Sequence, residues 1–543
     1  MMEKFKKGVS YMKRILSLLI ALAMVVAVIA LTACGGDPTD PTGTTTGKKD
    51  NTTASSSGDS TTASTGGNSS NTTASSSGDS TTASSGDGTT VSGETELTGK
   101  EKHPDFMDVN FGGREFRFST WKSDDWGNFE ISAEATGDDD IVTEAIIARN
   151  NTVEKLYNCK IVNEGSSDPT ALISNDVQLG KLTYDFCLSQ YSNAQYTSDY
   201  LNIAALDIDL DRNWWDQSFR KAFGVTVDGT EKLYSISGAF NLISYDATWA
   251  LFFNTEVYNS IISSGKSNID LYQAVRDKKW TIDMLLTLMD AAKADANADQ
   301  QYKYDDGDVL GFITIDNGYA ANAFYFAIGG KGIITDENGD KAPISTQNTD
   351  ISALSAAIDK AAEVFKSPYY EAKSGSKAQA AMSNGQALFV SECLAVAKRV
   401  TDENSKYSIV PYPMADENQG EYYTMVCNRG YGLRVSAAVS DYAQTGRFLD
   451  VFCYHSEKLV YPEYINFYKT QCFCEDESGE MLDLVLQSRV YDLDYFGMFG
   501  INSTMQSYIS SGKNMISKAI GSKSSAAKSK LDEYIAKRKD AKY

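Results

Sequence analysis

Apolar residues follow strand and helix spacing along the chain beyond about residue 105. Residues 114–119 alternate apolar and polar side chains, which predicts a strand. In residues 140–157, apolar side chains recur near helical spacing after an acidic start, which predicts a helix. Two further strands are predicted at residues 160–162 and 184–188.

The second half of the chain shows the same alternation of elements. A helix is predicted after Trp280, with Thr281 as its cap and with Met284, Leu285, Leu288 and Met289 on one face. Another begins at Ser440 or Asp441 and carries Phe448, Leu449 and Phe452. Short strands that alternate with helices predict an α/β architecture.

The N-terminal apolar run has the pattern of a secretory signal. A positively charged segment precedes the uncharged residues 15–30, and Leu31-Thr32-Ala33-Cys34 follows. A Cys after Leu-Thr-Ala resembles a bacterial lipobox, which implies that residues 1–33 are a signal peptide and that Cys34 is lipidated. We therefore expect lipid anchoring at the extracellular face of the cell membrane. Residues 15–32 are also long enough for a permanent membrane helix, which stays an alternative.

Residues 34–104 are almost devoid of apolar side chains after Cys34. Residues 51–64 recur unchanged at 71–84, in a stretch of Ser, Thr, Gly, Asn and Asp. Such a sequence buries nothing that could offset the entropy of ordering, so we predict a disordered tether. About 70 residues give a mean reach of about 45 Å. A glycosylated stalk is the alternative.

The charge of the chain excludes some partners. The net charge is -22, and removal of residues 1–33 deletes five positive charges and one negative charge. We expect no nucleic acid partner, because phosphate binding needs the opposite sign.

The 440 or so residues after the tether are too many for one ordinary core and predict two lobes.

Cysteines and histidines offer little chemistry. Of eight cysteines, Cys34 is assigned to the lipid, and Cys472 and Cys474 are too close for a zinc-type Cys-x-x-Cys. The other five are scattered in apolar surroundings, which favours buried free thiols. His103 and His455 are the only histidines, so a Ser-His-Asp enzyme has almost no base to use. The acidic residues at 207, 209 and 211 lack the Gly and Glu of a calcium loop. We expect no enzyme, no metal and no cofactor.

A set of short motifs resembles bacterial extracellular solute-binding proteins of family 1, the binding lipoproteins of ABC importers. The set covers most of residues 110–460, and its order carries the resemblance. The motifs are Gly112-Gly113-Arg114-Glu115-Phe116, Asp140-Ile141-Val142-Thr143-Glu144-Ala145, Arg149-Asn150-Asn151-Thr152-Val153, Leu233-Tyr234-Ser235-Ile236-Ser237-Gly238, Phe253-Asn254-Thr255, Lys279-Trp280-Thr281-Ile282-Asp283, Asn384-Gly385-Gln386-Ala387-Leu388-Phe389 and Ile409-Val410-Pro411-Tyr412-Pro413.

The resemblance implies a two-lobed, periplasmic-binding-protein-like (type II) α/β fold, with strands that cross a hinge and a ligand between the lobes. We place the crossings near residues 242–249 and 427–433. Lobe 1 is then expected at 105–245 plus 428–470, and lobe 2 at 246–427 plus 471–543. Closure of the hinge around the ligand is the expected switch.

Aromatic and polar residues near the expected cleft are the candidate ligand contacts. Trp and Tyr can stack on the apolar face of a sugar, and polar side chains can satisfy its hydroxyl rim. The candidates are Trp121 and Trp126 after the first strand, Gln190 and Tyr191 after the strand at 184–188, Tyr245, Asp246 and Trp249 at the first crossing, Tyr319 and Phe324 in a Gly-flanked segment, Glu392 after an apolar run, and Arg429 and Tyr431 at the return crossing. The doublet Trp214-Trp215 favours packing.

The sequence thus predicts a monomeric, lipid-anchored receptor that captures a carbohydrate, expected to be an oligosaccharide, and delivers it to an ABC permease. A peptide or other polar solute in the same fold stays open, as does a sensory role. A surface glycosidase or carbohydrate-adhesion protein is the alternative from another class, because a glycosidase needs only two carboxylates.

Overall fold

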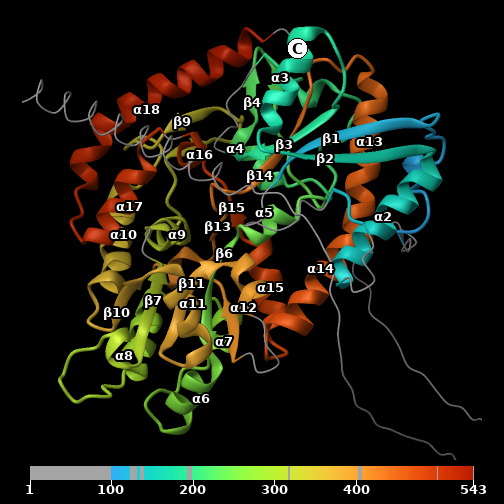
Figure 1. The fold of residues 1–543 in the computed structure, drawn as a ribbon. Coiled ribbons are helices and arrows are strands. Elements are labelled where there is room, and N and C mark those ends of the chain that lie inside the picture. The colour runs from blue at the N-terminus through green and yellow to red at the C-terminus, as the bar shows by residue number, and fades with distance from the viewer. Residues whose placement is uncertain are drawn as a thin grey trace, which may run out of the picture. The chain divides into compact units, whose positions relative to one another are not determined.

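The computed structural model describes residues 99–122, 131–134, 140–191, 198–315, 318–400, 406–497 and 499–541. The signal sequence, Cys34 and most of the tether lie outside these residues, so their assignments stay predictions. The chain from Ser92 onward forms one compact unit. Within it, two separate β-sheets define two lobes (Figure 1).

Lobe 1 is built around a four-stranded sheet of order β14-β3-β1-β2. The strands are β1 (Arg114–Trp121), β2 (Cys159–Ser166), β3 (Phe186–Gln190) and β14 (Tyr431–Val435). β1 is parallel to β2 and to β3, whereas β14 runs antiparallel to β3. The last strand therefore returns to this sheet from a distant part of the sequence.

Aromatic packing joins the lobe 1 sheet to its helices. These are α2 (Ile141–Tyr157), α3 (Pro169–Leu179) and α13 (Tyr442–His455). Phe448 of α13 stacks on Phe116 of β1 with ring centroids 3.7 Å apart. Asp140 and Asp441 cap α2 and α13 by accepting backbone N–H groups.

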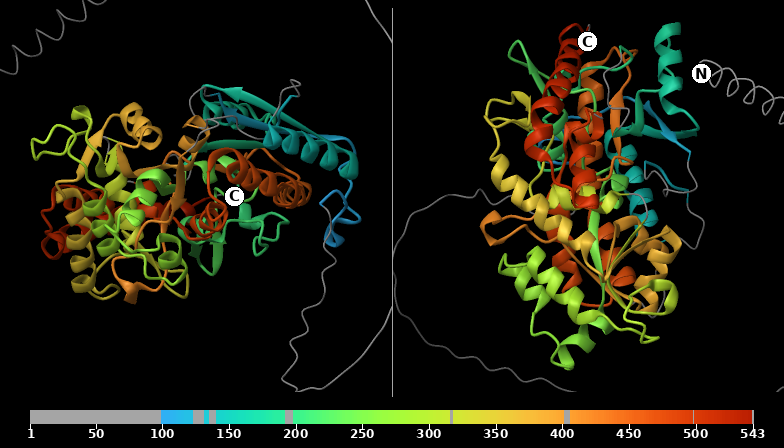
Figure 2. Two further views of the ribbon diagram at one scale, coloured as in Figure 1. Left: turned by 90° about the horizontal axis from the view of Figure 1, so that it is seen from below. Right: turned by 90° about the vertical axis from the view of Figure 1, so that its left-hand side faces the viewer.

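Lobe 2 contains a five-stranded sheet of order β10-β7-β11-β6-β12. The strands are β6 (Trp249–Asn254), β7 (Leu310–Ile315), β10 (Tyr370–Lys373), β11 (Ala387–Cys393) and β12 (Tyr407–Val410). β6 and β11 are buried along their whole length, as expected for strands covered on both faces. Helices lie on either side of this sheet (Figure 2).

Shorter strands and further helices complete the described part of the chain. Two π-helical turns, Ser456–Val460 and Tyr468–Cys472, flank α14. The remaining strands are β4 (Val225–Val227), β5 (Thr230–Lys232), β8 (Ile333–Thr335), β9 (Lys341–Pro343), β13 (Thr424–Met425) and β15 (Arg489–Val490). The remaining helices are α4 (Gln217–Phe223), α5 (Leu242–Asp246), α6 (Thr255–Ser263), α7 (Leu271–Arg276), α8 (Ile282–Ala292), α9 (Tyr319–Ala327), α10 (Ile351–Lys366), α11 (Gly375–Asn384), α12 (Ala397–Val400), α14 (Tyr461–Phe467), α15 (Ser478–Gln487), α16 (Leu493–Gly497), α17 (Asn502–Ser511) and α18 (Ile516–Lys539).

Backbone pairing joins the two expected crossings. Thr248 forms an antiparallel bridge with Val426, and the Cys427 N–H donates to the Ala247 carbonyl over 2.8 Å. The short strand β15 pairs in parallel with β13, which directly precedes the return crossing. The prediction that a strand makes the whole first crossing is corrected, because residues 242–246 form the short helix α5 before β6 begins.

The helix and strand assignments compare well with the sequence pattern. The elements at 114–119, 140–157, 160–162 and 440–455 are confirmed, and β3 begins two residues later than expected. Thr281 precedes α8 as expected, but its side chain makes no capping hydrogen bond. The two-lobed α/β fold is therefore confirmed, whereas the residue boundaries of the two lobes stay predictions.

Other findings concern the membrane and the cysteines. No helix in the described ranges is both long enough and apolar enough to cross a membrane. The seven cysteines of the described residues are free; Cys474 is exposed and the other six are buried. The expectation of buried free thiols is confirmed for the five scattered cysteines at 159, 187, 393, 427 and 453.

Candidate functional site

Five of the candidate residues form a connected row at the crossings, which we call the interlobe floor: Gln190, Trp249, Tyr319, Arg429 and Tyr431. Gln190 of β3 and Tyr431 of β14 are direct partners in the lobe 1 sheet, and their side chains are hydrogen-bonded. The Arg429 guanidinium donates to the Tyr319 hydroxyl. The ring of Tyr319 lies 5.5 Å from that of Trp249, which begins β6. The row thus connects both sheets.

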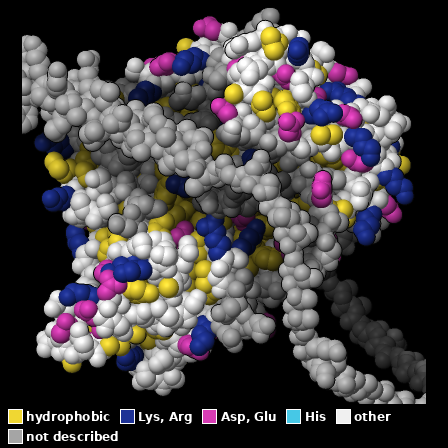
Figure 3. Space-filling view, viewed as in Figure 1, with side chains coloured by type: hydrophobic (Ala, Val, Ile, Leu, Met, Phe, Trp, Pro, Cys, Tyr) yellow, Lys and Arg dark blue, Asp and Glu magenta, His cyan; other side chains and the backbone are white. Residues whose placement is uncertain are grey.

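Polar and apolar parts of the interlobe floor differ in exposure. Trp249 and Tyr431 are buried, Gln190 and Tyr319 are half-buried, and Arg429 is exposed. Burial raises the pKa of the Tyr319 and Tyr431 hydroxyls, so both stay neutral hydrogen-bonding groups at ordinary pH. The space-filling view shows a hollow between the lobes, with apolar side chains inside it and Lys and Arg side chains at its border (Figure 3).

Two further candidates lie at the ends of strands beside the interlobe floor. Glu392 precedes Cys393, which pairs with Trp249 across β11 and β6. Burial raises the pKa of Glu392, against the lowering effects of its hydrogen bond from Cys393 N–H and of the charge of Arg399. Trp121 ends β1 with 36% of its surface exposed.

The position of Trp121 follows from the sheet. Because β1 and β3 are parallel, their carboxyl ends lie at one edge, so Trp121 and Gln190 share that edge. An exposed indole at a sheet edge has an unused apolar face. Trp121 therefore remains a candidate for stacking, whereas Trp126 lies outside the described residues.

Tyr191 belongs to a buried hydrogen-bonded network. Its hydroxyl donates to Ser244 Oγ over 2.8 Å, and Ser244 is 2.9 Å from the Tyr491 hydroxyl. Tyr491 and Arg489 both donate to Asp216 over 2.9 Å. Burial raises the pKa of Tyr191 to about 12. The network joins α4 and α5 to residues 489–491, and all of the polar groups just named bind other protein groups.

Asp246 and Tyr245 are likewise occupied by protein contacts. The Asp246 carboxylate accepts from Lys398, Tyr464 and Tyr468, each over 2.8 Å. Tyr245 is buried, and its ring lies 5.7 Å from that of Tyr464. The two residues join the first crossing to α14 and to the turn after it. We therefore place them in the structural support of the hinge.

Phe324 lies in the core of lobe 2. It is fully buried, and its ring contacts those of Phe312, Phe365 and Tyr412 at centroid distances of 5.1–5.9 Å. Its place in a Gly-flanked segment was the reason to propose it for the site, and that segment forms the apolar helix α9. Only Tyr319, at the start of this helix, reaches the interlobe floor.

Trp214 and Trp215 have the packing role that their doublet predicted. Both indole N–H groups donate to Asp450 of α13, over 3.3 and 3.0 Å. Burial raises the pKa of Asp450 to about 6. This contact attaches the segment before α4 to the helix that covers the lobe 1 sheet.

Two residues that sequence reasoning did not select lie next to the interlobe floor. The positive charge of Arg399, in α12, lowers the pKa of Glu392. Its position six residues after the end of β11 could have indicated that it lies near Glu392. Tyr495 is buried, and burial raises the pKa of its hydroxyl, which has no hydrogen-bond partner among the described residues. No local pattern identifies Tyr495, because the fold brings it from the distant C-terminal segment.

The described residues contain no group of three or more His, Cys, Asp or Glu side chains suited to a metal ion. Asp207, Asp209 and Asp211 instead form ion pairs with Arg447, Arg212 and Arg220. Each of the three carboxylates therefore pairs with a different guanidinium, and the three do not form a shared metal site.

Neither a protein-family model nor a curated protein matches the sequence. Several solved structures are similar in fold. Maltose-bound MalE3 of T. maritima is 11% identical, with 77% of this chain and 99% of that chain covered and a TM-score of 0.43. A cyclo/maltodextrin-binding protein complexed with maltotetraose is 13% identical, with coverages of 76% and 97% and a TM-score of 0.48. The galacto-N-biose-/lacto-N-biose I-binding protein of an ABC transporter from Bifidobacterium longum is 10% identical, with coverages of 78% and 98% and a TM-score of 0.48.

Proposed function

We propose that this protein is a lipid-anchored extracellular receptor that binds a carbohydrate between its lobes and delivers it to an ABC permease. The interlobe floor is the observation that carries the proposal. It presents aromatic rings and outward-facing polar groups at the point where the chain crosses between two lobes. The protein acts by binding and release, without chemical change of the sugar.

The chemistry of the interlobe floor suits a sugar. Pyranose rings have apolar C–H faces that pack on aromatic rings, and hydroxyl groups that need hydrogen-bond partners when buried. Arg429 supplies several N–H donors, Gln190 supplies both a donor and an acceptor, and Tyr319 supplies a neutral hydroxyl. These neutral and cationic groups can form hydrogen bonds with sugar hydroxyls, so the ligand does not need a negative charge.

The position of the interlobe floor suits hinge closure. Two crossings are paired at Thr248 and Val426, and rotation of the lobes about them would cover a ligand that contacts Arg429 and Tyr319. A closed form stabilised by the ligand is what a membrane permease could distinguish from the empty receptor.

The N-terminal sequence supports the anchoring part of the proposal. A lipidated Cys34 would hold the chain at the membrane, and the tether would give the lobes a mean reach of about 45 Å. Mass spectrometry of the membrane-bound protein is expected to show cleavage before Cys34 and acylation of that residue. An uncleaved N-terminus would contradict this part alone.

A thermal-shift screen tests the binding function. The purified protein is heated with mono- and oligosaccharides and, separately, with a peptide mixture. One class of sugar should raise the melting temperature saturably, since a ligand at one hundred times Kd adds about 2.7 kcal/mol to the free energy of unfolding. The sugar should be recovered intact. A shift with peptides alone, or hydrolysis of the sugar, would overturn the proposal.

A further inference from the structure

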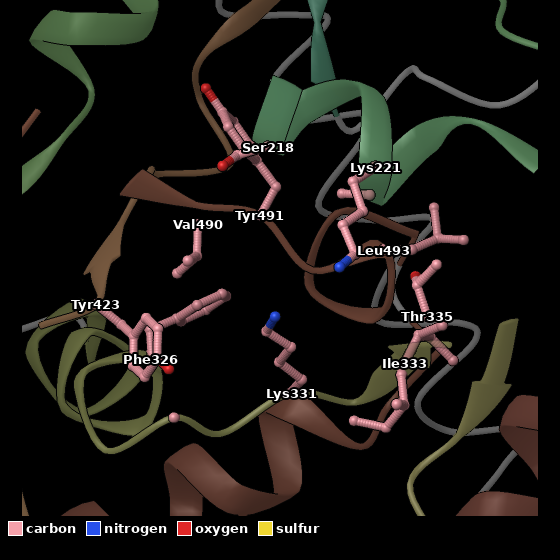
Figure 4. Close-up of a pocket in the computed structure, with 13 residues that line it drawn as sticks. Ser218, Lys221, Phe326, Lys331, Ile333, Thr335, Tyr423, Val490, Tyr491 and Leu493 are labelled. Atoms are coloured by element: carbon pink, nitrogen blue, oxygen red, sulfur yellow. The ribbon is translucent and has the colours of Figure 1, made fainter. Parts of the chain in front are cut away.

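A cavity beside α4 is lined by lysines. It has a volume of about 270 Å³ and shares no residue with the interlobe floor. Its walls come from α4, from residues 326–335, from Tyr423 and from residues 490–493. Lys221 and Lys331 lie on opposite walls, and their ammonium groups point toward each other across the cavity (Figure 4).

Among the described residues, two of the lysine side chains form no hydrogen bond or ion pair. In the part of the chain that the structure describes, neither the Lys221 nor the Lys331 ammonium has an acceptor. A third ammonium, that of Lys341, stands beside them and donates to the Lys221 carbonyl over 2.6 Å and to Thr335 Oγ1 over 2.9 Å. We call the cavity together with these three lysines the lysine pocket; Lys221 and Lys331 line the cavity, and Lys341 lies beside it. Positive charges gather here although the whole chain carries a net charge of -22.

The lysines repel one another and are partly removed from water. Burial, followed by the charge of Lys221, lowers the pKa of Lys341 to about 8. Burial also lowers the pKa of Lys331, against the opposing charge of Asp492. Such shifts mean that an anion placed among the ammonium groups would relieve an existing electrostatic cost.

Neighbouring carboxylates are occupied elsewhere. Asp492 accepts backbone N–H groups of Gly332, Ile333 and Asp494, and burial raises its pKa to about 7. The Glu231 carboxylate is bound to the Arg220 guanidinium over 2.7 and 2.9 Å. Neither acid reaches across to pair with the Lys221 or Lys331 ammonium.

We propose that the lysine pocket binds a small oxyanion, a phosphate, a sulfate or the carboxylate of an acidic sugar. Ammonium groups from opposite walls can surround such a group, since lysine acts as a compact point charge with several donors. Phe326, Ile333 and Leu493 add an apolar wall that leaves room for an organic body. The site is separate from the interlobe floor and does not depend on the function proposed for it.

Calorimetric titration of the purified protein at constant ionic strength tests the proposal. The probes are inorganic phosphate, sulfate, glucuronate and, as a neutral reference, glucose. At least one of the three anions should bind saturably with one-to-one stoichiometry, and more weakly as salt is raised. Phosphate or sulfate alone would indicate an inorganic ligand, and glucuronate an acidic sugar. Absence of saturable binding by all three anions would overturn the proposal.

Variants locate the anion in the lysine pocket. Lys331→Met should weaken anion binding at least tenfold, and Lys221→Met, an exposed position with little risk to folding, should do so too. Lys266→Met, an exposed lysine in another part of lobe 2, should leave anion binding unchanged. Equal affinity in wild type, Lys221→Met and Lys331→Met would contradict the site.

A stability measurement gives a second readout. Without anion, Lys331→Met should melt above wild type, because it removes a half-buried charge that is not hydrogen-bonded to any described residue. With saturating anion, wild type should gain melting temperature and the variant should not. A lower melting temperature for both Lys331→Met and Lys221→Met without anion would show that the lysines stabilise the fold and would overturn the proposal. Arg429→Ala should keep anion binding, so failure of the sugar proposal is distinguishable.

Discussion

Asp246 and Trp249 lie three residues apart in sequence, yet Asp246 belongs to a cluster with a structural role and Trp249 belongs to the interlobe floor. The Asp246 carboxylate is buried and accepts from Lys398, Tyr464 and Tyr468. In the interlobe floor, by contrast, Arg429 is exposed and holds Tyr319 with only part of its donor capacity. A polar group such as the Asp246 carboxylate, which is buried and bound by several protein donors, indicates a structural role. A polar group such as the Arg429 guanidinium, which still reaches solvent, is available to bind a ligand.

The largest expected effect comes from breaking the Asp246 cluster. Asp246→Ala removes the buried carboxylate that accepts from Lys398, Tyr464 and Tyr468, and should lower the free energy of unfolding by about 3–5 kcal/mol. Urea denaturation measures it. The control is Asp283→Ala, which breaks the exposed pair with Lys360 and should cost at most about 1 kcal/mol. Similar losses of unfolding free energy in the two variants would contradict the expected difference between a buried and an exposed ion pair.

A pH effect is expected at His455, which is buried in lobe 1 between Tyr157 and the Gly99 carbonyl. Burial lowers its pKa from 6.5 to about 4. The unfolded chain then takes up the proton first, so stability is present above pH 6.5 and is lost as pH falls toward 4, by about 3 kcal/mol.

The variant His455→Gln isolates this contribution. The difference in unfolding free energy between variant and wild type should change between pH 6.5 and pH 4 and be constant above that window. Chemical denaturation at a series of pH values measures it. A difference that is constant through the window would show that His455 does not titrate as its burial predicts.

In the interlobe floor, Arg429→Ala should affect binding far more than stability. Loss of hydrogen bonds from a charged donor corresponds to about 1.5–3 kcal/mol, or about a 10- to 100-fold weaker sugar affinity. The melting temperature should change little, because Arg429 is exposed. Arg447→Ala, which breaks an ion pair on α13, is the matched control and should bind normally. Normal binding by Arg429→Ala would remove this residue from the site.

The smallest effect is expected from Tyr319→Phe. The variant keeps the ring beside Trp249 and removes the hydroxyl that accepts from Arg429. An ordinary hydrogen bond contributes about 0.5–1.5 kcal/mol, so sugar affinity should fall about 2- to 10-fold. Calorimetry measures the change, and Tyr319→Ala should exceed it because the ring is also lost. Equal affinity in all three proteins would place Tyr319 outside the contact.

Local patterns were sufficient for most of lobe 1. The strand at 114–119 and the helices at 140–157 and 442–455 have strong periodicity and acidic caps, and each is found. Helix α18 gives a weak signal, because its apolar residues are widely spaced. It is stabilised by distant contacts, as between Tyr534 and the Phe223 carbonyl, which local spacing does not reveal.

The sequence predicted which residue types gather at the crossings, and the structure brings together only some of the residues it selected. Chain position correctly brought Gln190, Arg429 and Tyr431 near one another, because strand ends and crossings meet in this architecture. It could not separate Trp249 from Asp246 or Tyr319 from Phe324, since partners at distant positions decide which side chain is enclosed. The lysine pocket was missed for the same reason.

The central claim is that a sugar binds on the interlobe floor. A crystal structure of the complex with the sugar that gives the largest thermal shift tests it most directly. The account predicts sugar hydroxyls about 2.7–3.2 Å from the Arg429 guanidinium and the Gln190 amide, with Tyr319 alongside. A sugar bound elsewhere, with the interlobe floor empty, would contradict the account.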